Sequence, residues 1–263
     1  MKKMISRILN RLGYKVEKIT KKSSDSGTEN RNEDNQGDAK IMNICSKYTM
    51  TSKERLLALL DAVEYVSRNG ITGDFVECGV WKGGSSLTAA LKFSELNDFR
   101  EIYMFDTFEG MTSPTKCDVD YNGMNADTLL NMESKNEAST IWCVSDLDSV
   151  KETMKLAENY PKKQIKFIKG KVEDTIKSNM PSSISILRLD TDWYESTKYE
   201  MEYLFPKLVV GGVLIIDDYG HWLGAKKAID EYLRENNIKM LLNRIDYTGR
   251  IGVKVAENIS FGM

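Results

Sequence analysis

The feature that most constrains the fold is a strand, helix, strand pattern in which each strand ends in aspartate. Ile184–Leu189 predicts a short buried strand that ends at Asp190, and Val213–Ile216 predicts a second strand that ends at Asp217 and Asp218. The crossover of such a βαβ unit is right-handed, so the two strands lie parallel and their carboxyl ends share one edge of the sheet. Open α/β sheets bind their ligands at that edge.

The three strand-end aspartates, Asp190, Asp217 and Asp218, are therefore expected to converge. Like charges at short range raise one another's pKa, so three ionised carboxylates need a neutralising cation. No Lys or Arg adjoins the Asp217–Asp218 pair in the sequence, and carboxylate oxygens suit a hard cation. We predict a Mg²⁺ site formed by these three residues, with Asp192 outside the first ligands but able to substitute. The alternative is that the acids cap the helices that follow them.

The remaining pattern predicts an α/β domain with a parallel sheet and an antiparallel return at its end. Within the βαβ unit, the helix is expected to stop near Pro206, and Gly211–Gly212 is expected to form a turn. Ile238–Leu242 and Ile251–Val255 predict the strands that close the sheet.

Three segments are expected along the chain. Residues 1–20 predict a basic amphipathic helix, which could lie on an anionic membrane surface or pack on its own domain or a second subunit. Residues 21–40 are almost wholly polar and predict a linker or loose loop. Residues 41–263 form the α/β domain, in which the polar stretch 112–145 predicts a lid or substrate insertion. The insertion carries three side chains that could contact a substrate, Tyr121, Met124 and Trp142.

Composition excludes several classes of protein. The net charge of −2 leaves no electrostatic footprint for nucleic acid. The 4 cysteines are widely spaced and form no CxxC pair, as expected for a reduced, cytoplasmic protein without a zinc site or disulfide frame. No apolar run approaches the roughly 20 residues that span a bilayer, and the N-terminus lacks the apolar block of a signal peptide.

A second informative stretch, Glu77–Ser85, runs from a strand through a glycine turn into a helix. Gly79 and Gly83 let the backbone turn tightly and approach a ligand, and Ser85 or Ser86 can cap the helix. Trp81 stands where a dinucleotide fingerprint has its second glycine, so NAD or FAD is not expected. A cofactor without a pyrophosphate fits this turn better, although many α/β proteins have such turns for packing alone.

Acidic residues follow two further predicted strands. Asp106 ends the strand Ile102–Phe105, where it is placed either to accept hydrogen bonds from ribose hydroxyls or to cap the turn after it. Glu173 and Asp174 follow the strand Ile165–Ile168, where either could reach a purine amino group or begin the next helix.

His221, the only histidine of the chain, follows the Asp217–Asp218 pair by three residues. Lone histidines are commonly structural or solvated. At this edge of the sheet, His221 could instead contact the substrate or accept a proton.

Taken together, these motifs resemble a known family. VECGVWKGGSS, MFDTFEGM, RLDTDWYEST and GGVLIIDDYGHW occur in this order and are similar to blocks of the macrocin O-methyltransferase (TylF/MycF) family, within the metal-dependent class I O-methyltransferases. The resemblance runs from Asp74 to the C-terminus and does not cover residues 1–40. It implies a Rossmann-like class I methyltransferase fold, with a parallel sheet, an antiparallel last strand and helices on both faces.

The resemblance also implies an activity. The cofactor would be S-adenosylmethionine, and the acceptor a hydroxyl of a sugar in a glycan, nucleotide-sugar or glycosylated natural product. Glu77 and the glycine turn, with Gly79, Gly83 and Ser85, would hold the methionine end, and Asp106 the ribose. Asp190 would take the acceptor's proton, with His221 as the second candidate. A homo-oligomer is expected.

Two other functions stay open at this point. A catechol-type or phenol-type O-methyltransferase could use the same metal and donor. A non-catalytic protein that binds S-adenosylmethionine, tethered through residues 1–20, would bind the donor without transferring its methyl group. The trio of aspartates argues against the second of these.

Overall fold

The computed structural model describes the backbone of residues 31–256 and the side chains of residues 36–256. The chain divides into two compact units, Met1–Asn35 and Gln36–Met263, and the second unit carries the sheet described below. The predicted helix over residues 1–20 lies outside the described residues. None of the helices in residues 31–256 is both long enough and apolar enough to cross a membrane.

A seven-stranded sheet of order β3-β2-β1-β4-β5-β7-β6 forms the centre of this unit. Neighbouring strands from β3 to β5 are parallel, whereas β7 is antiparallel to both β5 and β6. The predicted parallel sheet with an antiparallel return is confirmed. The strands are β1 (Asp74–Cys78), β2 (Ile102–Asp106), β3 (Ile165–Lys169), β4 (Ile184–Leu189), β5 (Leu208–Ile216), β6 (Asn243–Arg244) and β7 (Arg250–Val253).

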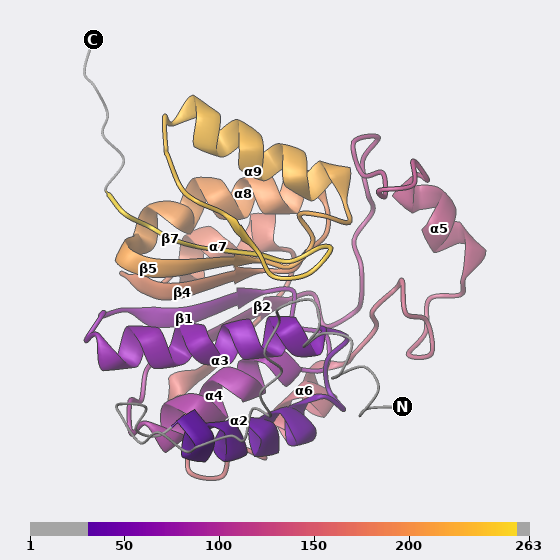
Figure 1. Ribbon diagram of the computed structural model, residues 1–263. Coiled ribbons are helices and arrows are strands. Elements are labelled where there is room, and N and C mark those ends of the chain that lie inside the picture. The colour runs from indigo at the N-terminus through magenta and orange to yellow at the C-terminus, as the bar shows by residue number, and fades with distance from the viewer. Residues whose placement is uncertain (1–30, 257–263) are drawn as a thin grey trace, which may run out of the picture. The chain divides into compact units, whose positions relative to one another are not determined.

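Helices cover both faces of the sheet (Figure 1). On one face, α2, α3, α4 and α6 pack on a core that includes Leu60, Phe75 and Phe93, and on the other, α7, α8 and α9 pack on a core that includes Leu187 and Phe205. The helices are α2 (Arg31–Cys45), α3 (Lys53–Arg68), α4 (Gly84–Glu95), α5 (Ala126–Met132), α6 (Leu147–Met154), α7 (Val172–Asn179), α8 (Tyr194–Tyr203) and α9 (Leu223–Glu235).

The prediction of a loose loop over residues 21–40 is wrong for residues 31–40, which belong to α2. Lys92 is almost fully buried and its Nζ lies 2.9 Å from Asp38 Oδ1, so an ion pair attaches α2 to α4. Ile41 and Cys45 then bury the end of α2 in the core. The sequence hid this helix because its first large apolar side chain comes only at Ile41, and tertiary contacts stabilise the polar turns before it.

The glycine pair Gly211–Gly212 lies within β5 and not in a turn, which corrects the prediction. Gly211 has a φ of 86° and donates its N–H to the Lys254 carbonyl at 2.7 Å. The pairing of β4 with β5 shifts register here, so the glycines form an irregularity that lets the strand continue. The strand expected over Ile238–Leu242 is also wrong, because pairing begins only at Asn243.

The insertion over residues 112–145 extends from the sheet and carries α5 (Figure 1). Asp118 is fully buried and accepts the Tyr194 backbone N–H at 2.7 Å, and the Trp193 indole N–H donates to the Thr112 carbonyl at 3.0 Å. Trp222 packs with Trp193 and α5 in a small apolar cluster. These contacts fix the insertion on the N-termini of α8 and α9, next to the carboxyl ends of the strands.

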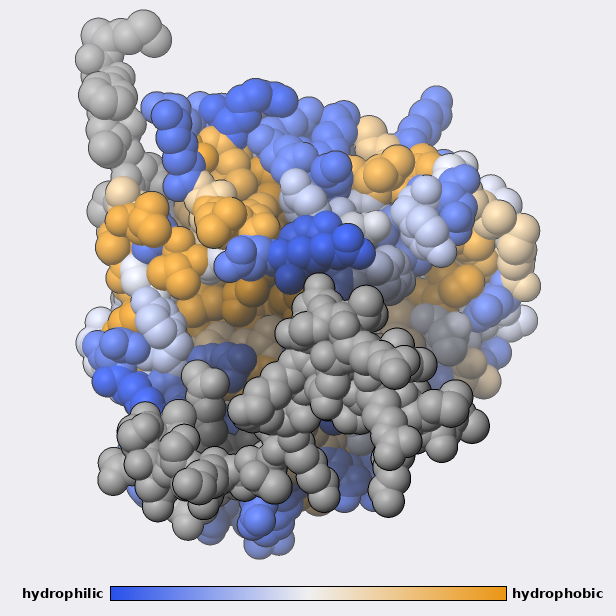
Figure 2. Space-filling model, in the orientation of Figure 1, coloured by the Kyte–Doolittle hydropathy of each residue, from blue (hydrophilic) through white to orange (hydrophobic). Residues whose placement is uncertain are grey.

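An apolar patch lies over β5 and β7 (Figure 2). Val210, Leu241, Val253 and Val255 are exposed in this part of the chain. Contiguous exposed apolar surface often marks a contact with another protein. This patch therefore suits the expected homo-oligomer, which stays a prediction.

Candidate functional site

A cavity of about 460 Å³ lies at the carboxyl ends of the parallel strands, within the size range of ligand sites. Its walls come from loops at the strand ends, from the segment before α3 and from the insertion. The main stretches are Thr49–Thr51, Gly79–Trp81, Asp106–Thr107, Gly170–Glu173, Asp190–Asp192 and Asp217–Asp218.

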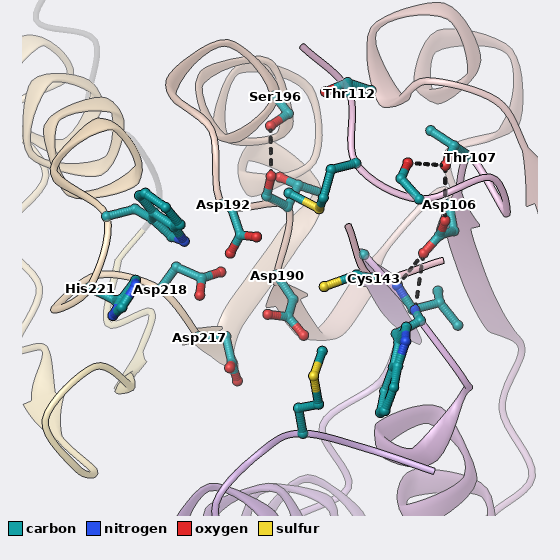
Figure 3. A pocket seen from close by; sticks show the side chains of 18 of the residues that line it. Asp106, Thr107, Thr112, Cys143, Asp190, Asp192, Ser196, Asp217, Asp218 and His221 are labelled. Atoms are coloured by element: carbon teal, nitrogen blue, oxygen red, sulfur yellow. Dashed lines mark hydrogen bonds between the residues drawn. The ribbon is translucent and has the colours of Figure 1, made fainter. Parts of the chain in front are cut away.

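Three carboxylates converge on one side of the cavity. Asp190 and Asp192 follow β4, Asp218 follows β5, and each offers an oxygen within 4.8 Å of those of the other two (Figure 3). The structure thus brings together Asp190 and Asp218 of the predicted trio. The third acid is Asp192, which the sequence suggested only as a substitute.

Asp217, the remaining acid of the predicted trio, is engaged elsewhere. Its Oδ1 lies 2.5 Å from Arg188 Nη2, and its Oδ2 pairs with the Arg55 guanidinium. Its side chain is 4% exposed. Both oxygens therefore face arginines, so this arrangement does not place Asp217 among the converging acids.

Arg188 is the cation at the centre of these contacts. It lies on β4, is 2% exposed, and its Nη1 lies 2.7 Å from Glu77 Oε1 and 2.6 Å from Asp190 Oδ2. Its Nη2 also donates to Thr51 Oγ1 at 2.9 Å. Burial alone would lower the pKa of Arg188, but Asp190 and Glu77 raise it above its ordinary value, so the guanidinium stays charged.

Glu77, expected to hold the methionine end of a cofactor, pairs with Arg188 and Ser86 beneath the cavity. Its side chain is 1% exposed. Burial raises the pKa of Glu77 to about 7, against the opposing effects of Arg188 and Ser86. Glu77 thus supports the floor of the site through Arg188 and Ser86 and is not among the residues that line the cavity, so its contact with a cofactor stays a prediction.

The converging acids are electrostatically costly. Burial raises the pKa of Asp218 well above its usual value, and Asp192 and Asp190 add to the rise. Burial likewise raises the pKa of Asp192 to about 7. Asp192 also has a φ of 66°, a conformation that a non-glycine residue seldom adopts. Backbone strain of this kind and crowded charges are typical of functional sites.

The glycine turn adjoins the acids and forms another part of the cavity wall. Gly79 has a φ of 81°, and a Cβ at this position would come within 1.9 Å of the Asp190 carbonyl oxygen, so only glycine fits between β1 and β4. Asp106 lines the cavity and accepts the backbone N–H groups of Val80 at 2.6 Å, Trp81 at 3.1 Å and Phe108 at 2.7 Å. Asp106 thus caps these turns, while its contact with a ribose stays a prediction.

The other expected cofactor residues divide into two groups. Ser85 and Glu173 line the cavity, at the start of α4 and in the first turn of α7. Gly83 precedes α4 with a φ of 86° and packs against Val150, and Asp174 is not among the lining residues. Gly83 therefore serves the turn, and Asp174 the beginning of α7.

His221 lines the cavity and lies beside Asp218 (Figure 3). Its Nδ1 is 3.2 Å from the Tyr247 hydroxyl oxygen, and its ring contacts those of Tyr121 and Trp222. Burial lowers the pKa of His221, Asp120 opposes the change and Arg55 adds to it. The imidazole is therefore neutral at neutral pH and can accept a proton.

Sequence reasoning missed the two arginines. Arg188 sits in an otherwise apolar strand, ISILRL, and Arg55 is on the helix α3, far from the site in sequence. A lone arginine in a strand expected to be buried was an available signal, because such a charge needs a partner. Nothing in the local pattern of α3 could have linked Arg55 to Asp217.

Comparison with known proteins decides the family. A family model described as Macrocin-O-methyltransferase (TylF) matches residues 3–252. The chain belongs to the macrocin O-methyltransferase (TylF) family. Its resemblance to this family is thereby confirmed, and as one of these enzymes it is an S-adenosylmethionine-dependent O-methyltransferase.

Individual relatives of this TylF-family enzyme agree. It is 32% identical over 206 residues to demethyldecarbamoylnovobiocin O-methyltransferase of Streptomyces niveus. The aligned region covers 77% of this chain and 74% of the relative. It is 31% identical over 209 residues to mycinamicin III 3''-O-methyltransferase of Micromonospora griseorubida, covering 77% and 76%. The solved structure of the O-methyltransferase NovP superimposes with a TM-score of 0.67 at 29% identity, over 80% of this chain and 83% of that one.

We predict that Arg188→Met destabilises this TylF-family enzyme by about 3–5 kcal/mol, because the change leaves Glu77 buried without its cation and Asp217 with Arg55 alone. Urea unfolding followed by circular dichroism measures the loss. Adding Glu77→Gln to Arg188→Met should recover part of it, because one of the unpaired charges is then removed.

Lys151→Met is the matched control. Lys151 pairs with Asp148 at 2.9 Å on an exposed helix surface. Removing such a pair should cost no more than about 1 kcal/mol. If Arg188→Met and Lys151→Met lowered the free energy of unfolding by similar amounts, the central role given to the Arg188 contacts would be contradicted.

Proposed function

We propose that this enzyme transfers a methyl group from S-adenosylmethionine to a sugar hydroxyl and that Mg²⁺ is required. The observation that carries the proposal is the convergence of Asp190, Asp192 and Asp218 in the same cavity as the glycine turn at Gly79. The names of the relatives support the sugar: one acts on mycinamicin III at a 3'' position, and another, of Streptomyces olivaceus, is a 4'-O-methyltransferase of a rhamnosyl tetracenomycin.

The converging acids fit a hard divalent cation. They offer only oxygen ligands, and their oxygens lie within 4.8 Å of one another. Burial, with repulsion from Asp190, raises the pKa of both Asp192 and Asp218. When bound, such a cation lowers the pKa of an alcohol oxygen and orients its lone pair. The proposed metal ligands are therefore Asp190 and Asp218, as the sequence predicted, together with Asp192. Asp217 instead pairs with Arg55 and Arg188.

The donor would occupy the side of the cavity formed by the glycine turn, Asp106 and Glu173. The narrow turn at Gly79 lets a ligand approach the backbone closely, and Asp106 keeps the loops after β1 and β2 together. The methyl group would pass in line from sulfur to the acceptor oxygen, which loses its proton. Asp190 already accepts from Arg188, so we assign the proton to the neutral imidazole of His221.

The purified enzyme should transfer the labelled methyl group of S-adenosylmethionine to sugar hydroxyls in a panel of neutral glycosides, nucleotide-sugars and catechols. Chelation with EDTA should stop the transfer, and added Mg²⁺ should restore it. Product analysis by mass spectrometry checks the acceptor. Transfer to catechols alone would contradict the sugar, and transfer that survives thorough chelation would contradict the metal.

Substitutions separate the two candidate sets of metal ligands. Mn²⁺ serves as the probe for the Mg²⁺ site because it is detected by electron spin resonance. Asp218→Asn and Asp192→Asn should each weaken Mn²⁺ binding, followed by calorimetry and electron spin resonance. Loss of a residue that only supports a ligand costs roughly 10- to 100-fold in affinity, and loss of a ligand should cost at least as much. Asp217→Asn should lower the free energy of unfolding but leave Mn²⁺ affinity of the folded protein little changed, because its oxygens face Arg55 and Arg188. Loss of binding in Asp217→Asn with retention in Asp192→Asn would instead support the trio expected from the sequence.

His221→Phe keeps an aromatic ring but removes the proton acceptor. We expect kcat to fall by roughly 10²- to 10⁴-fold while donor binding, followed by calorimetry with S-adenosylhomocysteine, is unchanged. Tyr247→Phe is the control, since it removes only the hydroxyl next to His221 Nδ1. An equal loss of kcat in both variants would argue against proton transfer to His221.

A further inference from the structure

Three aromatic rings from three separate loops meet beside the cavity. His221 and Tyr247 line it, and Tyr121, next to the lining residue Asp120, packs against both rings. Tyr121 comes from the insertion, His221 follows β5, and Tyr247 lies between β6 and β7. The ring centroids of Tyr121 and His221 are 5.3 Å apart, those of Tyr121 and Tyr247 6.0 Å, and those of His221 and Tyr247 6.0 Å. The planes are inclined to one another by 58° to 75°, so the rings form a corner and not a stack. We call these residues the aromatic corner.

The aromatic corner is unusually exposed for a cluster of rings. Tyr121 is 58% exposed and Tyr247 is 54% exposed, although each contacts the other. Apolar surface that is clustered and left in water at the rim of a cavity is typical of a binding site. The corner is not needed for the core, because Trp222, behind His221, already packs against Trp193 and α5.

The backbone fixes the corner next to the acids. The His221 N–H donates to the Asp218 carbonyl at 3.0 Å, so the corner begins within one turn of the converging carboxylates. Gly220 lies so close to the Tyr247 carbonyl oxygen that a Cβ would come within 2.0 Å of it. On the other side, Asp120 forms a backbone bridge with Trp222, which sets the position of Tyr121. The placement of all three rings is therefore determined by main-chain contacts.

We propose that the aromatic corner binds the acceptor sugar through the face that carries its C–H groups, while the hydroxyls on its edge reach the acids. This assignment rests on the proposed function. The faces of aromatic rings carry negative potential, which attracts the weakly positive C–H hydrogens of a sugar. Figure 3 shows His221 beside Asp218. A sugar held at Asp190, Asp192 and Asp218 would therefore have its ring next to His221.

Charge at the corner favours a neutral, C–H-rich acceptor. Asp120 lines the cavity beside Tyr121 and raises the negative potential there. Among the described lining residues the cations are Arg55 and Lys171, and Arg55 is paired with Asp217 and Asp246. A phosphate at the corner would therefore meet carboxylates. A deoxysugar offers a methyl group in place of a hydroxymethyl group and should bind better than its fully hydroxylated counterpart.

The test uses the complete enzyme with S-adenosylmethionine and Mg²⁺, and two simple probes, methyl α-L-rhamnopyranoside and methyl α-L-mannopyranoside, which differ by one hydroxyl. Tyr121→Ala should raise KM for the rhamnoside by roughly three- to tenfold with kcat and donor KM unchanged, because the lost contact is the same in ground and transition states. Tyr121→Phe keeps the ring and should retain the wild-type KM. The wild type should prefer the rhamnoside, and Tyr121→Ala should reduce that preference.

Tyr65→Ala is the matched control, because Tyr65 is an exposed tyrosine on α3 that lies outside the aromatic corner. Saturation-transfer NMR with S-adenosylhomocysteine bound gives a second measurement, in which irradiated aromatic protons should transfer saturation to the ring C–H protons of the rhamnoside in wild type and less in Tyr121→Ala. Unchanged acceptor KM and unchanged transfer in Tyr121→Ala and Tyr247→Ala would overturn the assignment. If the wild-type enzyme methylated no glycoside or other sugar, the proposed function itself would be overturned. The assay of the wild type alone gives that result, so the two failures can be distinguished.

Discussion

One buried guanidinium, that of Arg188, joins the ends of three neighbouring strands. It contacts Glu77 on β1, Asp190 after β4 and Asp217 after β5, and it is 2% exposed. Removing a charge from water costs several kcal/mol, which only well-placed partners can offset. Arg188 meets this requirement with acids on both sides, and Arg55 adds a second cation to Asp217 from α3. Because these contacts need the strands in one register, the same network that satisfies Arg188 also fixes where the loops of the cavity begin.

The network explains why Asp217 and Asp218 have different surroundings. Successive side chains at a strand point to opposite sides, so two adjacent aspartates cannot easily serve one site. Asp217 turns toward Arg188 and Arg55, and Asp218 turns toward Asp192. The prediction from the sequence treated the pair as a unit and overlooked this alternation. It also counted cations only beside the pair in sequence, whereas the relevant cation is Arg188 on the neighbouring strand.

The fold was predictable because its signals are local. Apolar runs ending in acids mark the parallel strands β2, β4 and β5. The glycine turn at Gly79 is required by the close approach of β1 to β4, where a Cβ would meet the Asp190 carbonyl. Features that depend on distant contacts were not predictable. Helix α2 is attached through Lys92 and Asp38, and the irregularity at Gly211 depends on the pairing of its N–H with Lys254. For the site, the positions of the acids and His221 could be inferred, but the direction of each side chain could not.

The cavity is divided by chemistry, and this division limits what can react there. On the proposed donor side, Asp106 accepts the backbone N–H groups of Val80, Trp81 and Phe108 and so holds the two loops in one shape, which suits a ligand recognised by its fit. Its acceptor side combines crowded carboxylates with exposed rings, so it suits a ligand that has hydroxyls on one edge and C–H groups on a face. A flat catechol could place its hydroxyls at the acids. It would contact the rings of the aromatic corner poorly, because they are inclined at 58° to 75° and enclose a corner and not a slot. A saturated ring with substituents on both faces fills such a corner better. The shape of the aromatic corner thus favours a sugar independently of any relative.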